Sequence, residues 1–132
     1  MITPPPSLDV WLAEAKQAPN AEQCGMYLCH NGVVRITPKA QVRQGEVGLP
    51  EVDHIDFSYD AEGVDAAVAQ TMEMDGIYYV RVWLAEGEVQ VGDSIMYVLI
   101  GGDIRPRVID ALQSLVGTIK NNLVVEKEVY VQ

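Results

Sequence analysis

The sequence predicts an α+β fold for a single domain that spans residues 1–132. Nearly half of the residues are hydrophobic (48%), which suffices for one ordinary core in a chain of this length. Apolar segments follow the order helix, three strands, helix, two strands, helix, strand. Because strands follow one another directly, we expect a mixed, mainly antiparallel sheet with helices packed on one side. A doubly wound parallel sheet does not fit this order.

The N-terminal part of the chain predicts a helix followed by an interrupted strand region. Residues 1–6 contain three consecutive prolines and predict a flexible lead-in. Ser7 is a suitable N-cap for a helix that ends near Gln17. Residues 24–36 are apolar enough for one or two buried strands, and Gly32 interrupts them. A glycine inside a strand pattern predicts a bulge or the close approach of another backbone or a ligand.

The segment 37–50 predicts a long loop, because it contains two prolines and two glycines. It also carries Lys39 and Arg43, two of the nine basic residues of the chain. Long loops in compact domains are often binding segments or are simply mobile, and both possibilities apply here.

The remaining elements follow from hydrophobic periodicity. We expect a strand at 52–59, a helix at 61–74 capped by Asp60, strands at 77–84 and 95–100 around a turn region at 86–93, a helix at 105–120, and a terminal strand at 124–131. The helix at 105–120 is the clearest of these. It carries a continuous apolar stripe of Val108, Ile109, Leu112, Leu115, Val116 and Ile119.

Composition excludes several classes of function. A formal net charge of −10 argues against non-specific nucleic-acid binding. No run approaches the length of a membrane span, and the first residues lack the pattern of a secretory signal. Cys24 and Cys29 do not form a metal-binding motif, so we expect free thiols in a reducing, cytoplasmic compartment, with no metal and no cofactor.

Five side chains are candidates for a site that binds an anion. Lys120 and Lys127 lie at a helix end and in the next strand, where both could face one pocket and lower each other's pKa. Arg105 stands at a helix start, a position that favours anions. Arg35 and His30 flank the glycine of an early strand. The alternative for all five is an ordinary surface or satisfied polar residue.

The order and spacing of these residues resemble a known family, the large, catalytic subunit of molybdopterin synthase (the MoaE family). The resemblance rests on Gly32-Val33-Val34-Arg35, on Gly87-Glu88-Val89-Gln90-Val91-Gly92-Asp93, and on Arg105, Lys120 and Lys127. It spans residues 25–130, nearly the whole chain.

The resemblance implies an α/β hammerhead fold, a homodimer within a heterotetramer, and a small ubiquitin-like sulfur-carrier partner (MoaD-like) with a C-terminal Gly-Gly. It implies sulfur transfer from the thiocarboxylated carrier to cyclic pyranopterin monophosphate, the phosphate-bearing pterin substrate, in molybdenum cofactor biosynthesis. Lys120 and Lys127 match the catalytic lysines of the family. Arg35 and Arg105 match positions in the substrate pocket, and His30, which we also assign to substrate binding, stands where the family usually has an aromatic residue before the glycine.

The sequence departs from the family pattern beside two of these cations. Ile104 stands where the family usually has a histidine, and Glu126 directly precedes Lys127. A divergent sulfurtransferase is our first interpretation. The alternatives are a relative that has kept the fold as a binding or scaffold protein, and an unrelated acidic α+β domain.

Overall fold

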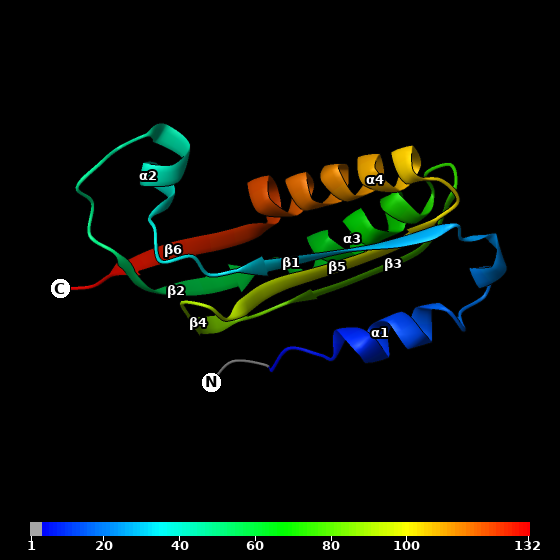
Figure 1. Cartoon of the computed structure of the whole chain (residues 1–132), viewed down its shortest axis with the longest axis horizontal. Helices are drawn as coiled ribbons and strands as arrows, with labels where there is room; N and C mark the ends of the chain where they lie inside the picture. The colour runs from blue at the N-terminus through cyan, green and yellow to red at the C-terminus, as the bar shows by residue number, and fades with distance from the viewer. Residues whose placement is uncertain (1–3) are drawn as a thin grey trace.

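The fold has six strands in two sheets together with four α-helices, as seen in a computed structural model that describes residues 4–132 (Figure 1). The elements are α1 (Leu8–Ala15), a 3₁₀ turn (Ala21–Gln23), β1 (Met26–Val33), α2 (Lys39–Gln44), β2 (Val52–Tyr59), α3 (Ala61–Met72), β3 (Ile77–Leu84), β4 (Gly87–Gln90), β5 (Ser94–Gly102), α4 (Arg105–Thr118), a π-helical turn (Ile119–Leu123) and β6 (Val124–Tyr130). The α+β class is confirmed. Residues 1–3 of the expected lead-in lie outside the described residues.

The strands form two three-stranded sheets in the orders β1-β5-β3 and β4-β2-β6. Each strand pair within residues 4–132 is antiparallel, so the pairing is purely antiparallel there and not mixed. The region 24–36 forms one strand, and its register shifts between Gly32 and Val33, which confirms the expected bulge. The region 86–93, expected as a turn, contains the short strand β4, which pairs with β2.

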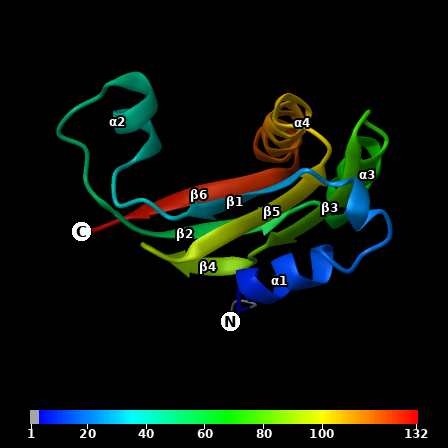
Figure 2. The same cartoon turned by 45° about the vertical axis from the view of Figure 1, so that its right-hand side comes forward.

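Helices cover both faces of the β1-β5-β3 sheet, so the expectation of helices on one side is wrong. Figures 1 and 2 show α3 and α4 on one face and α1 on the other. Val98 and Ile100 of β5 belong to the main core cluster with α3 and α4, whereas Tyr97 and Leu99 pack with Trp11 of α1. A continuous apolar run is typical of a strand that is buried on both faces.

The apolar stripe of α4 anchors the end of this helix next to the site described below. Val108, Leu115 and Ile119 are almost fully buried, whereas Ile109, predicted in the stripe, is 37% exposed. The helix lies close to β5, because a Cβ on Gly102 would come within 2.6 Å of a Val108 methyl group. Burial of Ile119 therefore fixes the position of its neighbour, Lys120.

The segment 37–50 is not a plain loop, because it contains the helix α2. No residue of α2 is buried, so hydrophobic periodicity could not predict it. The backbone N–H of Lys39 donates to a carboxylate oxygen of Glu128 on β6 at 2.9 Å, which supports the start of the helix. Gly45 ends it in the left-handed conformation, with φ of 71°.

No helix within residues 4–132 is both long enough and apolar enough to cross a membrane.

Candidate functional site

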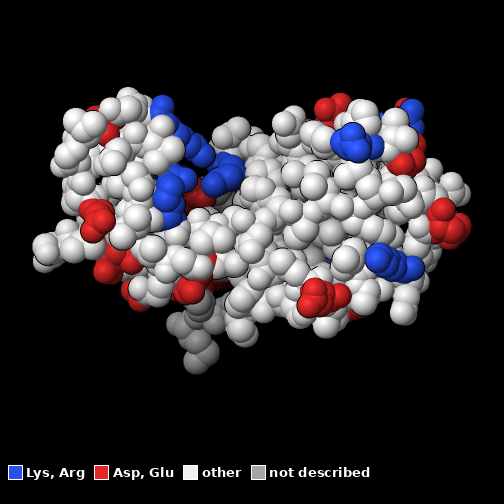
Figure 3. Space-filling model, viewed as in Figure 1, with Lys and Arg blue, Asp and Glu red and all other residues white. Residues whose placement is uncertain are grey.

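A small pocket lies between α2, the end of α4 and β6. In the space-filling view, Lys and Arg side chains gather around a hollow beside α2, with acidic atoms at its floor (Figure 3). The cavity has a volume of about 50 Å³. It is lined by Val33, Arg35, Thr37, Lys39, Arg43, Ile55, Ile95, Lys120, Glu126 and Glu128. The lining thus brings four cationic side chains together with two carboxylates.

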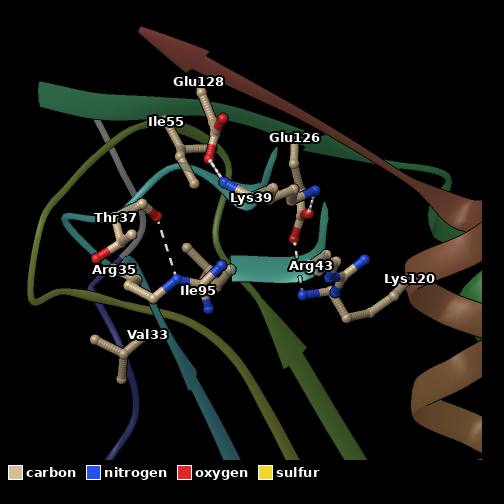
Figure 4. Close-up of a pocket in the computed structure, with 10 residues that line it drawn as sticks. All are labelled: Val33, Arg35, Thr37, Lys39, Arg43, Ile55, Ile95, Lys120, Glu126 and Glu128. Carbon is tan, nitrogen blue, oxygen red and sulfur yellow. Dashed lines mark hydrogen bonds and ion pairs between the residues drawn. The ribbon is translucent and has the colours of Figure 1, made fainter. Parts of the chain in front are cut away.

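Glu126 stands at the centre of the ionic contacts in this pocket. Its carboxylate accepts a hydrogen bond from Lys39 Nζ and pairs with Lys120 Nζ at 3.2 Å (Figure 4). The Glu126 side chain is only 4% exposed, whereas those of Lys39 and Lys120 are 35% and 28% exposed. Two ammonium groups from distant parts of the chain therefore converge on one buried carboxylate.

The two lysines keep Glu126 ionised in spite of its burial. Burial raises the pKa of Glu126, but the hydrogen bond from Lys39 and the charge of Lys120 outweigh burial and lower the pKa below its ordinary value. At neutral pH the carboxylate is therefore an anion, held in position by two cations.

Arg35 and Arg43 add two more cations to the same pocket. Arg35 Nε donates to the backbone oxygen of Thr37 at 3.2 Å, which orients the guanidinium. Among residues 4–132, no carboxylate oxygen lies within 4.0 Å of either guanidinium. These groups can therefore contact an anion without first losing a salt bridge.

His30 lies close to this pocket without lining it. It is partly buried on β1, and its Nε2 would lie 3.5 Å from a Cβ placed on Gly32, so the ring packs over the glycine at the bulge. Burial lowers the pKa of His30, and the nearby positive charge of Lys120 lowers it further. The imidazole is therefore neutral at pH 7 and can donate or accept a hydrogen bond.

Arg105 and Lys127 do not line the pocket formed by this single chain. Arg105 begins α4, and 15 residues of helical rise separate it from Lys120 by roughly 22 Å. Lys127 lies between Glu126 and Glu128 on β6, so strand alternation points it to the opposite face of the sheet. Its neighbour across the strands there is Asp56.

The group of potential metal ligands found among residues 4–132 lies on two neighbouring strands, with His54 and Asp56 on β2 and Glu88 on β4. The ring nitrogens of His54 lie 2.8 Å from Asp53, 3.6 Å from Asp56 and 3.4 Å from Glu88. The hydrogen bond to Asp53 raises the pKa of His54, partial burial opposes this, and the other two carboxylates raise it further. The three carboxylates around the imidazole are largely exposed, so this cluster lies at the surface.

Lys39, Arg43 and Glu126 line the pocket although they were not among the site residues predicted from the sequence. The basic residues of segment 37–50 were a usable signal, because they are clustered in a chain with few cations. The alternation of β6 was a second signal, since Glu126 and Glu128 must share the face that Lys127 does not.

Comparison with protein families gives one match. The model of the MoaE protein family matches residues 7–122, which include Arg35, Arg105 and Lys120 and end before Lys127. A search of curated protein sequences found no significant match.

Several solved structures share the fold of this chain, and the names of all of them refer to molybdopterin proteins. The chain is similar to molybdopterin synthase from Staphylococcus aureus, with a TM-score of 0.75 and 14% identity over 97% of this chain and 88% of that one. For the MoaE protein from Burkholderia ambifaria MC40-6 the TM-score is 0.71 and the identity is 15%, and the alignment covers 98% of this chain and 83% of that one. For a complex of subunits 1 and 2 of molybdopterin-converting factor from Helicobacter pylori 26695 the TM-score is 0.63 and the identity is 14%, and the alignment covers 96% of this chain and 85% of that one.

Proposed function

The chain belongs to the MoaE family, and we propose that it acts as the large subunit of a molybdopterin synthase. In this role it transfers sulfur from the thiocarboxylated C-terminus of a small carrier protein to cyclic pyranopterin monophosphate. The family match over residues 7–122 carries the proposal. The cation-rich pocket around Lys120 supports it, because both the carrier tail and the pterin phosphate are anions.

The charge of the pocket favours such ligands. Four cations and two carboxylates line it, an excess of positive charge in a chain with a net charge of −10. Because the surrounding field is negative, an anion can be held only by such a local cluster. The partial burial of Lys120 and Glu126 strengthens the interaction with a bound anion, since solvent screening is weaker there.

We assign the proposed roles as follows. Lys120 is the catalytic lysine of the pocket, Arg35 binds the substrate, and His30 supplies a neutral hydrogen-bonding group beside Lys120. Lys127, expected from the sequence as the second catalytic lysine, lies on the outer face of β6, and we propose that it contacts the docked carrier there. Arg105 lies far from the pocket of its own chain, and we propose that it reaches the pocket of the second subunit in a homodimer.

The proposed partners are a MoaD-like carrier that ends in Gly-Gly and a second copy of this chain, which together form a heterotetramer in the cytoplasm. The Helicobacter pylori structure that resembles this chain is a complex of two subunits of molybdopterin-converting factor. That similarity motivates the choice of a carrier subunit as the first partner to test.

The direct test is a product assay. The purified protein is mixed with a thiocarboxylated MoaD-like carrier and cyclic pyranopterin monophosphate, and the dithiolene product is measured. A known molybdopterin synthase serves as the positive control. We expect product that depends on all three components.

An absence of product with several carriers, beside an active control, would refute the proposed enzyme. Carrier binding without product would instead favour the binding or scaffold protein. The pairing of Lys120 with Glu126 is the observation that makes this second outcome worth measuring.

A further inference from the structure

We propose that Lys39, together with Lys120, binds the phosphate group of the ligand, and that Glu126 occupies this position in the unliganded protein. The proposal rests on the proposed function and deepens it, because it names a positioning residue outside the residues that suggested the family. Lys39 belongs to α2, a segment that sequence alone predicted as a loop.

Two lysine side chains converge on one carboxylate in this pocket. Glu126 pairs with the Nζ atoms of both Lys39 and Lys120, so the side chains of both lysines reach one oxyanion (Figure 4). A phosphate group presents anionic oxygens of the same kind to these two ammonium groups. Any anion that binds here competes with Glu126 for the same two ammonium groups.

The charged side chains that line the pocket also favour an anion. Lys39 and Arg43 from α2 join Arg35 and Lys120, while Glu126 and Glu128 supply two negative charges. The excess of positive charge favours an anion at this position, whether a cyclic phosphodiester, which carries one negative charge, or inorganic phosphate, which carries more near neutral pH.

The contacts between α2 and β6 also involve Lys39. None of the residues of this helix is buried, whereas Pro38 directly before it is. Lys39, the first residue of the helix, is tied to β6 twice, by its backbone N–H to Glu128 and by its Nζ to Glu126. These two contacts therefore run through the same lysine that faces the anion position.

Lys127 does not supply this second ammonium group in the single chain, because it lies on the other face of β6. Lys39 takes that place from a different part of the sequence. The two roles are separable by experiment, since Lys127 is proposed to contact the carrier and Lys39 the phosphate.

The test measures binding of inorganic phosphate by titration calorimetry in a low-salt buffer without phosphate. Lys39→Ala is compared with the wild-type protein, and Lys16→Ala is the matched control, because Lys16 lines a different cavity beside α1. We expect Lys39→Ala to weaken binding at least about tenfold through loss of a charge-assisted contact. Lys16→Ala should stay within about twofold, and Glu126→Gln should bind phosphate more tightly.

Several results would overturn the inference. These are no phosphate binding by the wild-type protein, equal weakening by Lys39→Ala and Lys16→Ala, or weaker binding by Glu126→Gln. A peptide that ends in Gly-Gly is titrated in parallel, and binding of this peptide with no binding of phosphate would also contradict the proposal. Circular dichroism confirms that each variant is folded before it is titrated.

The outcome separates this inference from the proposed enzyme. If phosphate binding depends on Lys39 but no dithiolene forms, the proposed function fails and the anion site stands. If dithiolene forms and Lys39→Ala keeps both its phosphate affinity and its KM, the assignment of Lys39 fails and the enzyme stands.

Discussion

Replacement of Glu126 by glutamine should destabilise the protein, because Glu126 is the anion that keeps two lysines together. Glutamine keeps the shape of the side chain and removes its charge. The wild-type carboxylate is ionised at pH 7, since the two lysines lower its pKa. Its contribution to stability is thus fully present at neutral pH, and it is lost only as pH falls through that lowered pKa.

The size of the effect follows from the exposure of the three groups. A hydrogen bond to a buried charged group contributes roughly 1.5–3 kcal/mol, and an exposed ion pair about 0–1 kcal/mol. Glu126 is 4% exposed, but Lys39 and Lys120 are 35% and 28% exposed, so solvent screens both pairs. The amide oxygen of glutamine can still accept one hydrogen bond. We therefore expect a loss of about 1–2 kcal/mol in the free energy of unfolding.

The assay is urea unfolding at pH 7 in a phosphate-free buffer, followed by circular dichroism. Glu14→Gln is the matched control, because Glu14 is 54% exposed and its pair with Arg81 lies at the surface at 3.3 Å. That change should cost less than about 0.5 kcal/mol. Equal stability of the Glu126→Gln and Glu14→Gln proteins would refute the reasoning that the Glu126 contacts are partly buried and cooperative.

Three further predictions address the histidines, the packing of α4 and the oligomer. NMR titration should show a pKa below 6.5 for His30 and above 6.5 for His54. Protonation of His30 therefore lowers the free energy of unfolding as pH falls below 6.5. The stabilisation from protonated His54 is fully present below 6.5 and is lost as pH rises through its raised pKa. Equal pKa values for the two rings would contradict both assignments. Gly102→Ala should lower the unfolding free energy by about 1–3 kcal/mol, because the new methyl group would lie 2.6 Å from a buried valine of α4, and an unchanged urea midpoint would argue against this contact. Arg105→Ala and Lys120→Ala should each be inactive in sulfur transfer, but a refolded mixture should regain activity through one intact site per mixed dimer; no recovery would reject the shared site.

The α4 region shows what the sequence could predict. Strong helical periodicity placed the helix and its buried stripe, because Val108, Leu115 and Ile119 follow the spacing that one face of a helix requires. Lys120 is the residue directly after Ile119, the last member of this buried stripe, so the predicted helix also gave the position of Lys120. The resemblance to the MoaE family, carried by Gly32-Val33-Val34-Arg35, placed Arg35 in the same pocket.

The α2 region shows what the sequence could not predict. A six-residue helix with no buried face leaves no periodic signal, and its start is supported by Glu128, 89 residues further along the chain. For β6, alternation groups Glu126 with Glu128 and places Lys127 on the opposite face. It does not decide which of the two faces points into the pocket. Pairing with β2 and the π-helical turn before β6 decide this in the folded protein.

The central claim is that the pocket around Lys120 transfers sulfur, and a single-turnover assay tests it most directly. Wild-type, Lys120→Ala and Lys16→Ala proteins are each mixed with thiocarboxylated carrier and cyclic pyranopterin monophosphate, and dithiolene is followed over time. We predict product from the wild-type and Lys16→Ala proteins at similar rates, and a loss of at least about 100-fold for Lys120→Ala. Equal rates for all three proteins would contradict the claim.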